Sequence, residues 1–314
     1  MKIRKLVSIL SPVDLVSAAF LFFLSILNLI YHSSVQEWLA LVVVNLAVVI
    51  LIVFLAWGAE RKGTRLLIGF HRWYCYFIII FIFKELYLMV HPIHPTDYDQ
   101  VFIAVDRWMF GVNPTQWMAR FIHPLLTEIL QIAYFSYYIL FIILGVEIYR
   151  RYPIQDFDKA AFIIVYGFYL SYLGYFLLPG VGPRFMLHDF SALDTELPGV
   201  FLTPILRSII NAGESIPAIH DHAVEFVQRD VFPSGHAQLT IIVMTLGFRY
   251  RLKTRWVLLC LGSMLIVATV YLRYHYVIDL IAGALFAFVT FWTGDRLEVW
   301  WRRMSLRLRN ATQT

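Results

Sequence analysis

The chain has 314 residues, of which 60% are hydrophobic and only 15% are charged, and its mean hydropathy is +0.69. This composition excludes an ordinary soluble domain, in which about a quarter of the residues are charged, and is typical of a membrane protein. The net charge of +5 comes from residues at the ends of apolar segments, so a nucleic-acid partner has no support. Cys75 and Cys260 both lie inside apolar runs, which argues against a structural disulfide.

Eight apolar segments are long enough, or nearly so, to cross a bilayer as helices, for which about 20 apolar residues are needed. In chain order they cover residues 13–31, 37–57, 68–90, 126–148, 159–178, 235–249, 256–272 and 276–294. Strand alternation is absent from them, and only helices or closed barrels satisfy their backbone hydrogen bonds in lipid. The sequence therefore predicts an all-α integral membrane protein with about eight transmembrane helices.

We expect three parts along the chain. Residues 1–67 form an N-terminal pair of transmembrane helices, and residues 68–294 form a six-helix catalytic core made of spans 3 to 8. Residues 295–314 form a basic cytoplasmic tail, which begins DRLEVWWRRMSLRLRN. This composition predicts an amphipathic helix that lies along the inner leaflet.

The lysine and arginine residues predict the orientation of the spans. Of the 26 in the chain, 19 lie at one set of span ends and six at the opposite ends. Because positively charged ends stay in the cytoplasm, both termini are predicted to be cytoplasmic. The two long connections, 91–125 and 179–234, then lie on the extracytoplasmic side with nine of the ten histidines. They mix apolar runs with Pro, Gly and acidic residues, which indicates interfacial or re-entrant helices that cap a site.

Three polar segments share this extracytoplasmic side: LPGVGPRF, FPSGHAQLT and YLRYHYVIDLIAG. In the second, Ser234 can cap a helix that begins at Gly235, and the first amides of a helix form an anion-binding site. Arg184 in the first segment and Arg273 in the third can add contacts to a phosphate group.

The histidines of these segments supply the chemistry. His275 and Asp279 are four residues apart on one helical face, so the carboxylate can hold one imidazole nitrogen and leave the other free to attack phosphorus. His236 can protonate the leaving oxygen. We therefore predict phosphoryl transfer through a phosphohistidine, without a metal ion or other cofactor, since arginine and amides supply positive charge. Each motif alone has a structural explanation, but their joint presence on one side favours catalysis.

These motifs resemble those of the type 2 phosphatidic acid phosphatase superfamily, over about spans 3 to 8. Residues 233–236 match its P-S-G-H motif, and His275 with Asp279 matches the end of its S-R-x5-H-x3-D motif, although Ala268 and Thr269 replace the Ser-Arg pair. Of its K-x6-R-P motif only Arg184 is present. FPSGH together with YLRYHYVIDLIAG looks like the corresponding motifs of the inositol phosphorylceramide synthase branch.

The resemblance implies His275 as nucleophile, Asp279 as its orienting residue, His236 as general acid and Arg184 as a phosphate ligand. The implied substrate is a phospholipid in the bilayer, and the branch favours transfer of its head-group phosphate to the hydroxyl of a lipid acceptor. Hydrolysis of a lipid phosphate monoester would use the same residues. A non-catalytic lipid binder or transporter would not need all three of His236, His275 and Asp279.

Two other groups of residues leave alternatives open. Lys84 and Glu85 lie about 10 Å inside the outer end of the third span, and ionisable groups at that depth are candidate substrate-pocket residues. Equally, Lys84 can extend toward the membrane surface while Glu85 forms hydrogen bonds between helices. A metal site formed by outer-loop histidines is less favoured than a metal-free site. Its ligands would be His91, His94, His220 and His222.

Overall fold

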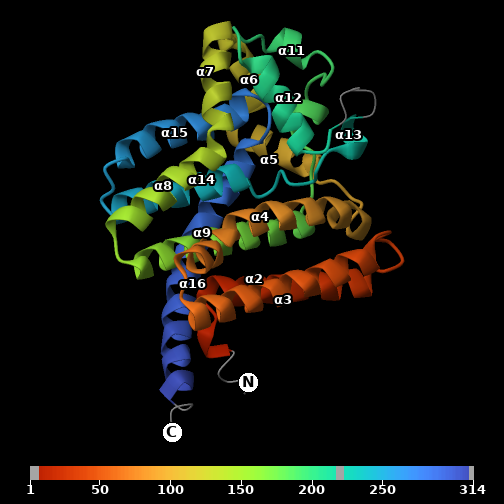
Figure 1. Cartoon of the computed structure of the whole chain (residues 1–314). Coiled ribbons are helices and arrows are strands. Elements are labelled where there is room, and N and C mark those ends of the chain that lie inside the picture. The colour runs from red at the N-terminus through yellow and green to blue at the C-terminus, as the bar shows by residue number, and fades with distance from the viewer. Residues whose placement is uncertain (1–6, 217–222, 311–314) are drawn as a thin grey trace. The chain divides into compact units, whose positions relative to one another are not determined.

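A computed structural model describes residues 7–216 and 223–310, and all regular secondary structure in this part of the chain is helical (Figure 1). Five helices are long and apolar enough to cross a bilayer. They are α2 (Pro12–Ile30), α3 (Trp38–Lys62), α4 (Arg65–Ile93), α9 (Ile154–Leu177) and α16 (Val277–Asn310). The protein is thus an all-helical, multi-pass membrane protein, as the composition predicts.

Local sequence sets the limits of these helices. The Ser11 side chain accepts a hydrogen bond from the Asp14 backbone, and the Asp14 side chain accepts one from the Ser11 backbone, with Pro12 in the first turn of α2. This reciprocal cap satisfies amide groups that a helix start otherwise leaves without partners. The α3 helix ends at Gly63, which adopts a left-handed conformation with φ of 59°.

The predicted span 126–148 is not one continuous helix. It forms α7 (Pro124–Phe135) and α8 (Tyr137–Arg151), which are bent by 49° at Ser136. The Ser136 hydroxyl donates to the carbonyl of Ala133 at 2.7 Å, and such back-bonding by serine bends helices. If the pair counts as one broken span, the described residues contain six candidate spans.

Helices also form at the two remaining predicted spans, but they are shorter. They are α14 (Gly235–Arg249), with 15 residues, and α15 (Arg255–Tyr271), with 17 residues. The total of eight transmembrane helices therefore stays a prediction.

Short helices occupy both long connections. The first contains α5 (Asp99–Phe110), α6 (Pro114–Met118) and the 3-10 helix η1 (Ala119–Phe121). The second contains α10 (Pro183–Met186), α11 (Leu193–Glu196), α12 (Thr203–Gly213) and α13 (Ala223–Phe226).

The described helices belong to two compact units. The first unit comprises Met1–Ile93, Arg151–Leu170 and Phe288–Thr314, and the second comprises His94–Arg150 and Ser171–Ala287. In the first unit α3 packs against both α2 and α4, and in the second α15 packs against α7 and α14. The two units are defined by how closely their residues pack together. The predicted division of the chain by function, at residues 67 and 294, stays a prediction.

The basic C-terminal segment differs from the expected separate surface helix. Its described residues continue α16 without a break to Asn310, because neither Pro nor Gly interrupts the segment after Gly294. Trp301 is buried and its indole nitrogen donates to the Leu10 carbonyl at 3.1 Å, while the Ser305 hydroxyl donates to the Ser8 carbonyl. This end of α16 is thus part of the packed first unit.

Candidate active site

Two buried carboxylates of α5 hold the backbone of the candidate site. Asp99 accepts hydrogen bonds from the amides of Val181 and Gly182, at 3.0 and 2.8 Å, and from the hydroxyl of Tyr276 at 2.8 Å. Asp106, two helical turns later, accepts from the first amides of α16, those of residues 277 and 278, both at 2.9 Å. The α5 helix therefore fixes both the bend before Arg184 and the start of the helix that carries Asp279.

Ser234 begins α14 as expected. Its side chain accepts from the amide of Ala237 at 3.2 Å, and its own amide donates to the Asp279 carbonyl at 3.0 Å. The two helices approach closely at this point, since a Cβ atom on Gly283 would lie 2.6 Å from the Ser234 carbonyl oxygen. This contact brings the P-S-G-H segment to the His275–Asp279 segment.

His275 is buried and its two ring nitrogens meet different partners. Its Nδ1 lies 3.0 Å from the Val231 carbonyl and 3.4 Å from Oδ2 of the fully buried Asp279. Both are acceptors, so they assign the ring proton to Nδ1 and leave a lone pair on Nε2. Nε2 lies 3.4 Å from Nδ1 of His236. The expected pairing with Asp279 is present, and a backbone carbonyl shares the orientation of the ring.

His236 lies between two tyrosines from the broken span. The Tyr134 ring stacks on it with centroids 4.7 Å apart, and the Tyr137 ring lies 4.4 Å away at an angle of 41°. The Tyr137 hydroxyl also donates to the Gly235 carbonyl at 3.3 Å. The bend at Ser136 falls between these tyrosines, so the break in the helix allows both rings to contact His236.

Arg184 is 3% exposed, and its guanidinium stacks over the ring of Tyr274 at 4.6 Å. Tyr274 in turn stacks on Tyr134 at 4.3 Å, which connects Arg184 to His236 through two rings. The bend that precedes Arg184 requires glycine, because Gly182 has φ of 97° and a Cβ atom there would lie 2.8 Å from the Tyr274 carbonyl. The guanidinium forms an ion pair with Glu214.

The side chain of Arg273 has a different partner from that of Arg184. Its backbone carbonyl accepts from the amide of Arg184 at 3.0 Å, whereas its buried side chain forms an ion pair with Glu196 of α11. Although it is only two residues from His275 in the sequence, its side chain thus contacts the second long connection. A role in phosphate binding stays a prediction for this residue.

Burial lowers the pKa of His275 well below its usual value, and the neighbouring His236 and the positive charge of Arg184 lower it further. The hydrogen bond to the Val231 carbonyl opposes this shift. A lowered pKa keeps the imidazole neutral near pH 7, which is the form that can attack phosphorus. Neutral His275, oriented through Nδ1, is therefore suited to act as a nucleophile through Nε2.

Two further candidate residues belong to the third predicted span. Lys84 and Glu85 belong to the first unit, where Glu85 accepts hydrogen bonds from the side chains of Asn28 and Asn45 at 3.3 and 2.7 Å. Their assignment to a substrate pocket stays a prediction.

The alternative metal site is only partly covered by the structure, because His220 and His222 lie outside the described residues. His94 contacts the Phe176 carbonyl at 3.0 Å. Within residues 7–216 and 223–310, no group of three or more His, Cys, Asp or Glu side chains is placed to hold a metal ion.

Sequence reasoning missed several residues of this site. The acidic pair of α5 and the tyrosines of the broken span support the histidines, and Glu196 and Glu214 bind the two arginines. One signal was available: Asp99 and Asp106 are seven residues apart in an apolar helix, a spacing that places them on one face. No comparable pattern distinguishes Tyr134 and Tyr137 from the many aromatic residues around them.

Comparison with protein-family models finds a match to the PAP2 superfamily over residues 100–293, which is more than half of the chain. The matched region contains Arg184, His236, His275 and Asp279, and it leaves out the first three long helices. Comparisons with curated proteins and with solved structures gave no match.

Proposed function

The chain belongs to the PAP2 superfamily, and on this premise we propose that it is a lipid phosphotransferase that works through a phosphohistidine at the extracytoplasmic face of its membrane. Family membership and the apolar helices make it a membrane protein of the lipid phosphatase type. The single observation that supports the chemistry is the arrangement of two imidazoles. Nε2 of His275 lies 3.4 Å from His236 while Nδ1 is held by the Val231 carbonyl and by Asp279.

In the first proposed step, Nε2 of His275 attacks phosphorus of the lipid head group. The new N–P bond forms as the P–O bond to the leaving group breaks. His236 enters this step as an imidazolium, whose charge the bound phosphate offsets, gives one proton to the leaving oxygen and becomes neutral. Asp279 and the Val231 carbonyl stabilise the imidazolium through Nδ1. Arg184, whose charge acts on both histidines, stabilises the negative charge on the phosphoryl oxygens.

In the second proposed step, an acceptor hydroxyl gives its proton to His236 and attacks phosphorus, and the N–P bond breaks. This restores the neutral His275 and the protonated His236. A lipid hydroxyl yields transfer, whereas water yields hydrolysis. Transfer is supported by the resemblance of FPSGH with YLRYHYVIDLIAG to the inositol phosphorylceramide synthase branch.

The decisive experiment incubates the purified chain with vesicles that contain phosphatidylinositol and either ceramide or a diacylglycerol whose acyl chains differ from those of the phosphatidylinositol, and follows every lipid by mass spectrometry. We expect loss of phosphatidylinositol to equal the gain of the phosphoinositol derivative of one acceptor. Release of free inositol phosphate together with diacylglycerol, and no phosphoinositol derivative of the acceptor, would instead assign a hydrolase.

The proposed side of the membrane has a separate test. A single cysteine placed in residues 91–125 should react with an impermeant thiol reagent from outside, whereas one next to Arg251 should not. The opposite labelling pattern would overturn the proposed orientation, and an extracytoplasmic active site with it.

A further inference from the structure

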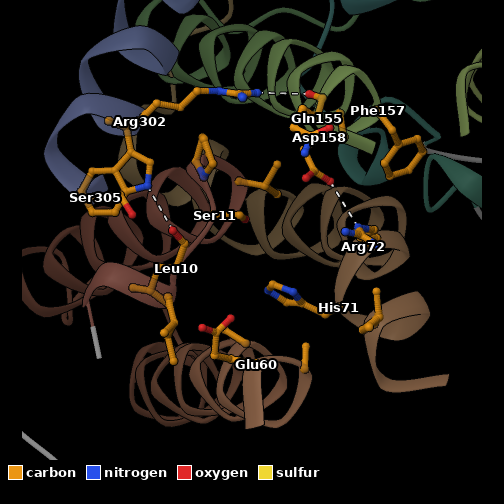
Figure 2. A pocket seen from close by; sticks show the side chains of 18 of the residues that line it. Leu10, Ser11, Glu60, His71, Arg72, Gln155, Phe157, Asp158, Arg302 and Ser305 are labelled. Atoms are coloured by element: carbon orange, nitrogen blue, oxygen red, sulfur yellow. Dashed lines mark hydrogen bonds and ion pairs between the residues drawn. The ribbon is translucent and has the colours of Figure 1, made fainter. Parts of the chain in front are cut away.

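A cavity of about 570 Å³ lies in the first unit, at the ends of α2, α3, α4 and α9 and beside the last turns of α16 (Figure 2). Its volume is in the range of small-molecule sites, about 300–1,000 Å³. None of the residues of the candidate active site lines it. Most of the lining residues precede residue 100 or follow residue 293, so they lie outside the region that matches the PAP2 superfamily.

A buried carboxylate orients the histidine of this cavity. Asp14 is fully buried, and its oxygens lie 2.9 Å from Nε2 of His71 and 2.7 Å from the hydroxyl of Tyr74. Because a carboxylate only accepts hydrogen bonds, the neutral His71 ring carries its proton on Nε2 and its lone pair on Nδ1. The cavity wall thus contains an imidazole with a defined acceptor nitrogen.

Two arginines supply hydrogen-bond donors. Nε of Arg72 lies 3.4 Å from Asp158, and Arg302 forms an ion pair with Glu298 and donates to the Gln155 carbonyl at 3.1 Å. The charges of Arg72 and Arg302 both act on Asp158, so the two guanidiniums converge on one part of the cavity. A guanidinium has five N–H donors, and these contacts leave donors on each arginine for a further oxygen ligand.

Glu60 provides the opposite charge. It lines the cavity on the same side as His71 in Figure 2, and no other described residue forms a hydrogen bond or an ion pair with it. Asp158, in contrast, is paired with Arg72. The cavity therefore has an arginine-rich part and a separate carboxylate, and apolar residues such as Val13, Ile68 and Leu306 form the rest of its wall.

We propose that this cavity binds a phosphodiester head group that also carries an ammonium group. Arg72 and Arg302 hold the phosphate oxygens, while Glu60 and Nδ1 of His71 hold the ammonium group. The apolar wall contacts the glycerol and the first carbons of the acyl chains. Phosphatidylethanolamine supplies this head group within a bilayer, and glycerophosphoethanolamine supplies it without acyl chains. The inference does not depend on the proposed enzymatic function.

The test measures lipid binding to the detergent-purified full chain by native mass spectrometry, with phosphatidylethanolamine and phosphatidylglycerol as probes. We expect the protein to prefer phosphatidylethanolamine, and Glu60→Gln to reduce this preference about three- to fivefold, the size of one partly exposed charge contact. Glu37→Gln, the same change at the opposite end of α3, is the matched control and should not alter the preference. Equal preferences in the wild-type chain and Glu60→Gln would overturn the proposal.

A second pair of variants tests the phosphate contact. Arg302→Gln should weaken binding of both lipids by a similar factor, whereas Arg296→Gln, earlier on α16, should not. Unfolding temperatures of all variants identify any loss of folding, and Glu60→Gln removes no contact among the described residues. Competition by glycerophosphoethanolamine would show that the head group suffices, and its failure to compete would assign the site to the intact lipid. Unchanged binding of both lipids in Arg302→Gln would contradict the phosphate contact.

Discussion

The described residues include an Asp–His pair with a fully buried carboxylate in each unit, His275–Asp279 and His71–Asp14, and the pairs differ in what the second imidazole nitrogen contacts. In the second unit, Nε2 of His275 faces His236, and the charge of Arg184 acts on both rings. In the first unit, His71 faces a cavity whose charged residues are of both signs. A carboxylate beside histidine therefore only orients the ring. The group at the free nitrogen decides whether the site is suited to group transfer or to binding.

The largest expected effect is the loss of the nucleophile. His275→Ala should lower lipid turnover by more than about 10⁴-fold and abolish any acid-labile phosphoprotein, because the proposed N–P bond forms at this residue. His32→Ala, at an exposed histidine of the first unit, is the control and should leave both unchanged. Turnover is measured by lipid mass spectrometry and the phosphoprotein by labelling with radioactive substrate. A phosphoprotein that survives in His275→Ala would exclude this nucleophile.

Loss of the acid should have a smaller and substrate-dependent effect. His236→Ala should slow lipid turnover by about 10²–10⁴-fold, the usual contribution of a positioned acid. An aryl phosphate, whose leaving group needs no proton, should recover part of this loss. Steady-state rates on both substrates measure the difference. If the aryl phosphate rescued His275→Ala and not His236→Ala, the two roles would be exchanged.

The two orienting carboxylates should respond differently to the same substitution. Asp279→Asn should slow turnover about 10- to 100-fold, the equivalent of one charge-assisted hydrogen bond, because the Val231 carbonyl still holds the His275 ring. Asp14→Asn should instead lower the free energy of unfolding by about 1–3 kcal/mol, since it disturbs hydrogen bonds to Ser11, His71 and Tyr74. Activity assays and thermal unfolding in detergent measure the two effects. Equal losses of activity would remove the distinction between the pairs.

The dependence of rate on pH tests the electrostatics of His275. Because burial, His236 and Arg184 lower its pKa, the neutral nucleophile persists as the pH falls through about 6.5, the usual histidine value. Protonation of His275 should therefore lower kcat/KM only at pH values well below about 6.5, the usual histidine value. In His236→Ala, with the aryl phosphate, one cause of the shift is absent, so the acid limb should move to higher pH. A limb at the usual histidine value in the wild-type enzyme would contradict a buried nucleophile.

The smallest expected effect concerns the carboxylates that pair with the site arginines. Glu196→Gln removes the ion pair of Arg273, so if Arg273 binds phosphate, inorganic phosphate should inhibit about two- to fivefold more strongly. Asp194→Asn removes the comparable ion pair of Arg207, which lies outside the proposed machinery, and serves as the control. Inhibition constants measured in parallel decide the result. An unchanged constant in Glu196→Gln would assign Arg273 to the support of α11.

Much of the fold follows from local sequence. Runs of apolar residues predict the helices, because backbone groups in lipid must find partners within the chain, and Ser11 and Ser234 cap the helices that follow them. The bend at Ser136 escaped prediction, since its serine interrupts the apolar run without proline or glycine. The His275–Asp279 pair was visible because four residues make one helical turn.

Contacts between residues far apart in the chain were decided only by the tertiary structure. The carbonyl of Val231 orients His275 across 44 residues, Asp106 caps the start of α16 across 171, and Asp14 meets His71 across 57. Helical periodicity relates residues within a few turns and carries no information about which helices become neighbours. By itself the sequence identified the candidate residues for phosphoryl transfer, which are Arg184, His236, His275 and Asp279. Packing of the helices decided that Nδ1 of His275 is held by the Val231 carbonyl and that Nε2 faces His236. It also decided that His71 meets Asp14.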